Sequence, residues 1–117
     1  MSDAPFRVVA LGVGHDRAAF HSGSLPLDRY LKEQVTQDMR RRMAACFVTL
    51  TDEQRVVGFY TLASASLLLN GLPSHMIKKL PRYPTVPAVR LGRLAVDFSF
   101  KGQGLGGALL ADALDRA

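Results

Sequence analysis

A glycine-rich segment near the carboxyl end has the residue types and spacing to bind a phosphate group. It reads Lys101, Gly102, Gln103, Gly104, Leu105, Gly106, and it lies between an apolar run and a helical pattern. Successive backbone N–H groups in such a turn, at the start of a helix, form a concave site for anions. Glycines let the ligand approach because a Cβ would hold it away from the amides, and because some turn positions need a positive φ. Lys101 adds a cation at the edge of this predicted loop.

Three interpretations of these glycines compete. A Walker loop needs Gly-Lys followed by Ser or Thr, which is absent here. Gly102, Gly104 and Gly107 satisfy the dinucleotide spacing Gly-x-Gly-x-x-Gly. That motif, however, opens a βαβ unit and has an acidic residue about 20 positions later. Here a predicted hairpin precedes the loop, and the chain ends before such a residue could occur. A helix start without any ligand is the third interpretation.

The charge distribution favours a phosphate-bearing ligand. Lys and Arg number 15 against 10 Asp and Glu, for a net charge of +5. No acidic residue lies between Glu53 and Asp97, where six cations occur: Arg55, Lys78, Lys79, Arg82, Arg90 and Arg93. Such a basic stretch fits a cofactor or a nucleic acid. On charge alone, a solvated surface explains it equally well.

The elements that must position these residues follow from the hydrophobic periodicity. Residues 6–11 form a predicted strand. A helix is predicted from Leu25, with one apolar stripe at four-residue spacing: Leu27, Leu31, Val35, Met39 and Met43. Pro26 and Asp28 suit its first turn, and three consecutive arginines, Arg40, Arg41 and Arg42, suit its carboxyl end. We expect both methionines to belong to the core.

The second half of the chain predicts a hairpin, an irregular connection, a strand and a helix. Strands 46–50 and 55–63 are separated by a polar tetrad, which is typical of an antiparallel hairpin. One glycine and four prolines predict irregular structure over residues 71–87. Residues 89–96 form the next predicted strand. The final helix has a predicted apolar face made by Leu105, Ala108, Leu109, Ala113 and Leu114. The pattern predicts an α/β (α+β) domain.

Several classes of protein and site are disfavoured. The single cysteine, Cys46, cannot make an internal disulfide, nor a zinc site by itself. The three histidines, His15, His21 and His75, lack metal-ligand spacing, so no metal is expected. The longest apolar runs are too short to span a bilayer, and no signal peptide is evident. We therefore expect a cytoplasmic protein without membrane contact.

The loop and its surroundings resemble the acetyl-CoA motif of GNAT acetyltransferases. In that motif a cation or Gln is followed by two residues, Gly, any residue and Gly, as Lys101, Gly104 and Gly106 are placed here. The chain is most similar to the tRNA-acetylating toxins of bacterial toxin–antitoxin pairs. The similar segments are Phe20-His21-Ser22-Gly23, Leu27-Asp28-Arg29-Tyr30-Leu31, Gln37-Asp38-Met39-Arg40-Arg41, Val56-Val57-Gly58-Phe59-Tyr60-Thr61-Leu62-Ala63, Leu80-Pro81-Arg82-Tyr83-Pro84 and Leu91-Gly92-Arg93-Leu94-Ala95-Val96-Asp97. Ser22 departs from the branch, which usually has Cys there.

The resemblance implies a GNAT fold with a mixed central sheet flanked by helices, and one domain over residues 1–117. It implies acetyl-CoA as cofactor, bound by Leu94, Ala95 and Val96 through the pantetheine arm and by Lys101, Gly102, Gln103, Gly104, Leu105 and Gly106 through the diphosphate. It implies transfer of the acetyl group to the amino group of aminoacyl-tRNA, which blocks translation. Candidate contacts to the acceptor end are Arg40, Arg41, Arg42, Lys78, Lys79, Arg82, Arg90 and Arg93. A homodimer and an antitoxin of the ribbon-helix-helix type are the implied protein partners.

The catalytic residues are unknown from the sequence. Family members are longer and usually supply a tyrosine as general acid from their last strands and helix, whereas Tyr30, Tyr60 and Tyr83 match no catalytic position. We expect a chain truncated after the loop helix, which turns over slowly for lack of that donor. The alternatives are completion of the sheet by a second chain, a non-catalytic module that pairs with an antitoxin or itself, and a small-amine acetyltransferase. The acid-free stretch disfavours a polycationic small amine.

Overall fold

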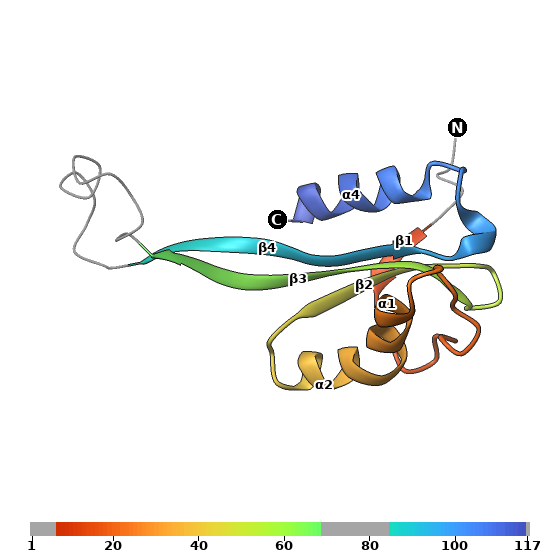
Figure 1. The fold of residues 1–117 in the computed structure, drawn as a ribbon, viewed down its shortest axis with the longest axis horizontal. Helices are drawn as coiled ribbons and strands as arrows, with labels where there is room; N and C mark the ends of the chain where they lie inside the picture. The colour runs from red at the N-terminus through yellow and green to blue at the C-terminus, as the bar shows by residue number, and fades with distance from the viewer. Residues whose placement is uncertain (1–6, 69–84, 117) are drawn as a thin grey trace.

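The computed structural model describes residues 7–68 and 85–116, and within them the predicted order of elements is confirmed. Strand β1 (Arg7–Ala10) is followed by a helical run made of α1 (Leu25–Arg29), η1 (Tyr30–Gln34) and α2 (Val35–Arg40). Strands β2 (Ala45–Leu50), β3 (Val56–Leu68) and β4 (Thr85–Val96) come next. The turn η3 (Phe98–Phe100) then leads to helix α4 (Leu105–Arg116). The strands form one sheet in the order β1-β2-β3-β4 (Figure 1).

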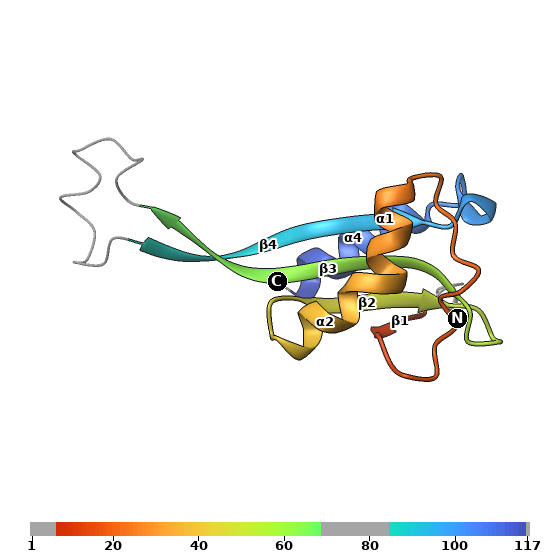
Figure 2. The ribbon, with the colours of Figure 1, turned by 60° about the horizontal axis from the view of Figure 1, so that its bottom comes forward.

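The helices cover opposite faces of this sheet, as Figures 1 and 2 show. One core cluster joins the α1–η1–α2 run to the sheet, with Leu31 and Val35 fully buried against Val48 and Phe59. The second cluster joins α4 to the other face. Successive residues of a strand point to opposite faces, so Phe59 enters the first cluster and Tyr60 the second. The fold is therefore a sheet between two helical layers.

The first helix contains a π-helical turn that the sequence did not predict. Its apolar stripe repeats every four residues, which drifts around a helix of 3.6 residues per turn. The wider η1 turn, with its i→i+5 hydrogen bonds, offsets that drift. Arg17 stabilises the turn by donating hydrogen bonds to the Leu31 carbonyl and to Thr36 Oγ1, each at 3.0 Å. Met39 packs against the core as predicted, but Met43 lies beyond α2 and is 59% exposed, so that prediction is wrong.

The β2–β3 hairpin is confirmed, but β3 and β4 are longer than predicted. β3 continues to Leu68 and β4 begins at Thr85, so the predicted irregular segment is wrong over residues 85–87. Pro87 lies within β4, which is the edge strand of the described sheet, where a missing N–H is tolerated. The rest of that predicted connection lies outside the described residues. All described strand pairs are antiparallel, so the expected mixed sheet is not seen among them.

Gly92 marks a bulge in β4. Thr61 pairs with Arg93 while Leu62 pairs with Leu91, which leaves Gly92 as the extra residue. A Cβ at Gly92 would lie 2.9 Å from Thr61 Oγ1, and that same oxygen accepts a hydrogen bond from the Arg93 N–H at 3.1 Å. The bulge therefore requires glycine because the space for a side chain is already filled.

Helix α4 packs through a narrower face than predicted. Leu105, Leu109 and Ala113 are buried, as expected. Ala108 is exposed and Leu114 is 72% exposed, so these two assignments are wrong. Among the predicted residues, only the stripe at i, i+4 and i+8 is buried against the sheet. Of the helices described, none is long and apolar enough to cross a membrane.

Candidate cofactor-binding site

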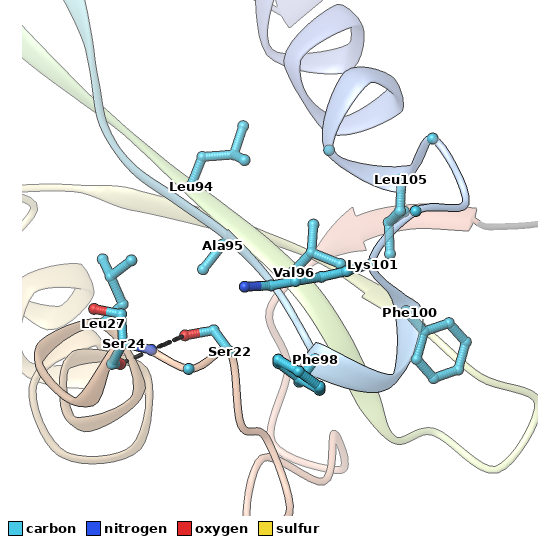
Figure 3. A pocket seen from close by; sticks show the side chains of 14 residues that line it. Ser22, Ser24, Leu27, Leu94, Ala95, Val96, Phe98, Phe100, Lys101 and Leu105 are labelled. Carbon is cyan, nitrogen blue, oxygen red and sulfur yellow. Dashed lines mark hydrogen bonds between the residues drawn. The ribbon is translucent and has the colours of Figure 1, made fainter.

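A cavity of about 640 Å³ opens where β4 ends and α4 begins (Figure 3). One wall comes from the end of β4, the turn η3 and the glycine loop. The other comes from a segment before α1 together with Leu27. The lining residues are Ser22, Gly23, Ser24, Leu27, Leu94, Ala95, Val96, Phe98, Phe100, Lys101, Gly102, Gly104, Leu105 and Gly106. Every residue predicted for the cofactor lies in this set except Gln103.

The glycine loop presents its backbone to the cavity. Gly102 and Gly104 have φ values of +83° and +79°, which L side chains rarely adopt. No heavy atom lies within 4 Å of where their Cβ atoms would be, so the space beside this backbone is open. The first bond of α4 runs from the Ala108 N–H to the Gly104 carbonyl. The preceding amides of the first turn have no acceptor within the helix, so they remain available to a ligand at the positive end of the helix dipole.

Lys101 places a cation in the cavity. Its side chain points from the loop toward the segment that carries Ser22 (Figure 3). A Cβ at Gly23 would lie 3.7 Å from the Lys101 Nζ atom, and Gly23 itself has a φ of +95°. Glycine at this position therefore allows the left-handed backbone conformation and leaves space for the end of the Lys101 side chain.

The backbone of β4 faces the cavity along the edge of the described sheet. The Asp97 N–H donates to the Val57 carbonyl at 2.8 Å. Hydrogen-bonded and non-hydrogen-bonded pairs alternate along an antiparallel ladder. The polar groups of Ala95 therefore point to β3, and those of Leu94 and Val96 point away from it. Because β4 is the edge of the described sheet, these groups can pair with an extended ligand.

The second wall is held by buried Asp28, whose structural contacts the sequence did not reveal. Asp28 Oδ1 accepts hydrogen bonds from the Ser22 N–H at 2.9 Å and from Ser22 Oγ at 2.6 Å. Its predicted place in the first helical turn is confirmed. The lining residues Ser22, Gly23, Ser24, Leu27, Phe98 and Phe100 were missed as site residues. Only the family-like Phe-His-Ser-Gly segment could have indicated part of this set.

The structure describes five of the eight predicted nucleic-acid contacts. The Arg93 guanidinium lies 3.7 Å from the centre of the Tyr30 ring, in a cavity of about 400 Å³ that shares Leu27 with the cofactor cavity. Arg40, Arg41 and Arg42 are exposed at the far end of the helical run, roughly 20 Å along its axis from Pro26. Arg90 is exposed on β4. Lys78, Lys79 and Arg82 lie outside the described residues.

Neither described tyrosine lines the cofactor cavity. Burial, and then a hydrogen bond to Asp38, raise the pKa of Tyr30 to about 12. Burial and a hydrogen bond to Asp112 raise the pKa of Tyr60 still further above its usual range. Both phenols are thus held protonated by structural partners. Tyr83 lies outside the described residues.

The described part of the chain contains no group of three potential metal ligands. The His15 Nδ1 atom accepts a hydrogen bond from the Gly12 N–H at 2.9 Å. The exposed His21 ring lies 3.5 Å from Asp28 Oδ2. The two rings therefore have different contacts, and His75 lies outside the described residues.

The glycine loop at the start of α4 and the sheet covered by helices on both faces are features of the GNAT fold. The chain belongs to the Acetyltransferase (GNAT) family, whose model matches residues 15–117.

Curated relatives share much of the sequence. The chain is 42% identical over 101 residues to a tRNA-acetylating toxin of Mycobacterium tuberculosis, covering 86% of this chain and 59% of that protein. It is 31% identical over 103 residues to the probable toxin TacT of Sinorhizobium fredii, covering 87% of this chain and 57% of the relative. The chain thus spans less than two thirds of the length of these relatives.

Solved structures share the fold. AtaTR bound with AcCoA matches with a TM-score of 0.82 at 30% identity, covering 95% of this chain and 67% of that one. AtaT complexed with acetyl-methionyl-tRNAfMet matches with a TM-score of 0.78 at 30% identity, covering 94% and 67%. The GNAT membership and the layered α/β fold expected from the sequence are confirmed.

Proposed function

We propose that this protein is an N-acetyltransferase that moves the acetyl group of acetyl-CoA to the amino group of an aminoacyl-tRNA and thereby acts as a toxin that blocks translation. The observation that carries the proposal is the cavity that joins the glycine loop to the free edge of β4. Two relatives support the choice of substrate: the tRNA-acetylating toxin of Mycobacterium tuberculosis, and AtaT in complex with acetyl-methionyl-tRNAfMet.

The residues of the cavity fit acetyl-CoA. Amides at the start of α4 and in the open glycine turn would hold the diphosphate, and Lys101 would add a charge-assisted contact. The outward-facing polar groups of Leu94 and Val96 would pair with the pantetheine amides. When bound, the cofactor supplies an acetyl thioester. The apolar side chains beside it, Leu27 and Phe98 among them, would exclude water from that group.

The acceptor amine needs little help from a base. A free α-amino group has a pKa of about 7.7–8.0, so a substantial fraction is neutral near pH 7. Arg93 lies beside the cofactor cavity and would contact the acceptor end, while Arg40, Arg41 and Arg42 would contact phosphates farther along the stem. Neither described tyrosine is placed to protonate the leaving thiolate, so the proposal assigns no general acid to the described residues.

The proposal includes protein partners. AtaT has been seen bound to the C-terminus of its antitoxin AtaR, together with acetyl-CoA. By the same resemblance we propose a cognate antitoxin of the ribbon-helix-helix type, a homodimer in the absence of antitoxin, and residence in the cytoplasm, where aminoacyl-tRNA is found. The net charge of +5 supports an acidic or polyanionic partner.

The cofactor site is tested by a matched pair of substitutions. Gly106 lines the cavity and a Cβ there would meet only an ordinary contact at 3.8 Å, whereas Gly107 is adjacent, exposed and does not line it. Neither has a positive φ. Gly106→Glu should abolish the binding of acetyl-CoA measured by calorimetry, because its carboxylate repels the diphosphate. Gly107→Glu should leave binding within a few-fold of the parent. Equal binding by both variants would place the cofactor elsewhere.

The substrate is tested by incubating the chain with radiolabelled acetyl-CoA and either aminoacyl-tRNA or spermidine. Label that enters aminoacyl-tRNA, with binding that weakens steeply as salt is added, supports the proposed acceptor. Label in spermidine alone would favour the small-amine alternative. Cofactor binding without transfer to either acceptor would favour the non-catalytic module.

A further inference from the structure

Asp97 is a buried carboxylate directly behind the cofactor cavity. It is 1% exposed, yet it does not line the cavity itself. It follows the last residue of β4 and precedes the turn η3, at the point where the chain leaves the sheet for the glycine loop. A buried carboxylate must be compensated by donors, and the identity of those donors shows which segments it joins.

The two carboxylate oxygens bind different walls of the cavity. Oδ1 accepts the Ser99 N–H at 2.9 Å and so fixes the turn η3, which carries the first wall. Oδ2 accepts the His21 N–H at 3.0 Å and so fixes the second wall, 76 residues away in the sequence. Arg55, at the start of β3, donates to the same Oδ2 at 3.2 Å.

The pairing with His21 is reinforced by the backbone. The Phe98 N–H donates to the His21 carbonyl at 2.6 Å, next to the bond from His21 to Asp97. Two residues after His21, the backbone at Gly23 lies close to the Lys101 ammonium group: a Cβ at Gly23 would be 3.7 Å from Nζ. The width of the cavity at Lys101 is thereby tied to the carboxylate of Asp97.

We infer that Asp97 is a positioning residue that latches the two walls of the cavity together and presets the distance between the glycine loop and the Ser22–Ser24 segment. Its effect on the cofactor rests on the function proposed above; its effect on the two walls does not. An uncharged isostere cannot replace it. An asparagine in its place would offer only one oxygen as acceptor. Its amide N–H₂ group, which is a donor, would then face either the Ser99 N–H, or both the His21 N–H and Arg55, and these groups are donors as well. Either orientation releases one wall.

The latch is tested first by hydrogen exchange without cofactor. In Asp97→Asn the amide of His21 or of Ser99 should exchange about tenfold faster or more, because it loses a charge-assisted bond. Amides of the β2–β3 ladder should not change. Unchanged exchange at both positions would overturn the inference.

The second readout is the affinity for acetyl-CoA, with two controls. Asp97→Asn should weaken it about tenfold or more. Arg55→Met keeps both backbone contacts and should bind within about threefold of the parent. Val48→Ala destabilises the core at a residue that does not line the cavity and should leave affinity within about threefold of the parent. Equal weakening in Val48→Ala and Asp97→Asn would mean that general stability alone acts, and would overturn the positioning role. If the parent fails to bind, the proposed cofactor is wrong, while the exchange data still decide the latch.

The unmodified chain gives a test that needs no variant to fold. The amides of His21 and Ser99 both donate to the Asp97 carboxylate, so both should be protected from native-state exchange in the unmodified chain. Exchange of either amide at the rate of an unprotected amide would overturn the latch.

Discussion

The hydroxyl of Tyr60, on β3, donates a hydrogen bond to Asp112, on α4. Asp112 also accepts a hydrogen bond from Arg116 at 2.7 Å, and the Arg116 guanidinium lies 4.3 Å from the centre of the Phe47 ring on β2. Burial raises the pKa of Asp112, but the bonds from Tyr60 and Arg116 outweigh it and lower the pKa overall. Helix α4, which follows the glycine loop, is thus fixed to the sheet by these polar contacts as well as by its apolar face.

This chain of contacts predicts that Asp112→Ala destabilises the fold. The variant leaves the Tyr60 hydroxyl without its acceptor and frees Arg116, which should cost about 1–3 kcal/mol in the free energy of unfolding. Urea denaturation measures the effect. Asp115→Ala, an exposed carboxylate on the same helix, is the matched control and should change stability by less than about 0.5 kcal/mol. Equal costs for the two variants would contradict the role assigned to Asp112.

The bulge at Gly92 predicts a non-additive pair of substitutions. Gly92→Ala should cost about 1–3 kcal/mol, because its Cβ would lie 2.9 Å from Thr61 Oγ1. Thr61→Ala should also destabilise, since the Arg93 N–H loses its acceptor. In the double variant the clash is absent, so the combined cost should be less than the sum. A double-mutant cycle by urea denaturation checks this, and strict additivity would contradict it.

The environment of Tyr30 predicts a pH dependence at the alkaline end. Its pKa is raised to about 12 by burial and by Asp38, although Arg93 acts in the opposite direction. A raised pKa means that the folded state favours the protonated phenol. The resulting stability is complete below the unfolded value of about 10 and is lost as the pH rises through about 12.

Tyr30→Phe should therefore reduce the loss of stability between these two pH values, by up to about 1.4 kcal/mol per pH unit. Urea denaturation at a series of pH values measures the slope. Tyr60 and Cys46, whose pKa values are also raised, titrate in both proteins and cancel in the comparison. An unchanged slope would show that Tyr30 is not held protonated.

The exposed arginines predict a change in the salt dependence of tRNA binding, under the proposed function. Each contact between an arginine and a phosphate contributes about one unit to the slope of log affinity against log salt. Replacing Arg40, Arg41 and Arg42 by alanine should reduce the slope by one unit for each residue that touches RNA. Filter binding across a salt series measures it. Lys32→Ala removes an exposed cation outside the predicted set and serves as the control; a slope changed only by that control would contradict the assignment.

The conformation of Gly23 predicts a local effect on the cofactor cavity. Gly23→Ala forces a side chain into a φ of +95°, at a cost of about 1–3 kcal/mol, and narrows the space beside Lys101. Affinity for acetyl-CoA should fall in calorimetry. Gly14→Ala is the control, because Gly14 is exposed, has no positive φ and has no neighbour near a new Cβ. Retained affinity in Gly23→Ala would show that this wall does not limit binding.

Local patterns in the sequence were sufficient for the order of elements and for the loop. Leu27, Leu31 and Val35 repeat at helical spacing, and the glycines before Leu105 mark a helix start, because both signals depend on residues within one or two turns of each other. The same signals failed at Met43, which lies beyond the end of α2, and at Leu114, which lies beside the buried stripe of α4 and not on it. Strand ends were misplaced because pairing between β3 and β4 stabilises positions such as Pro87 that local propensity disfavours.

What the sequence by itself determined is therefore the set of elements, the phosphate-type loop and the family resemblance carried by contiguous motifs. Tertiary structure alone decided the second wall of the cavity, the free edge of β4 and the role of Asp97. The physical reason is distance along the chain. A carboxylate that joins His21 to Ser99 through bonds spanning 76 residues leaves no periodic signal, since nothing in the local sequence fixes which distant amide will reach it.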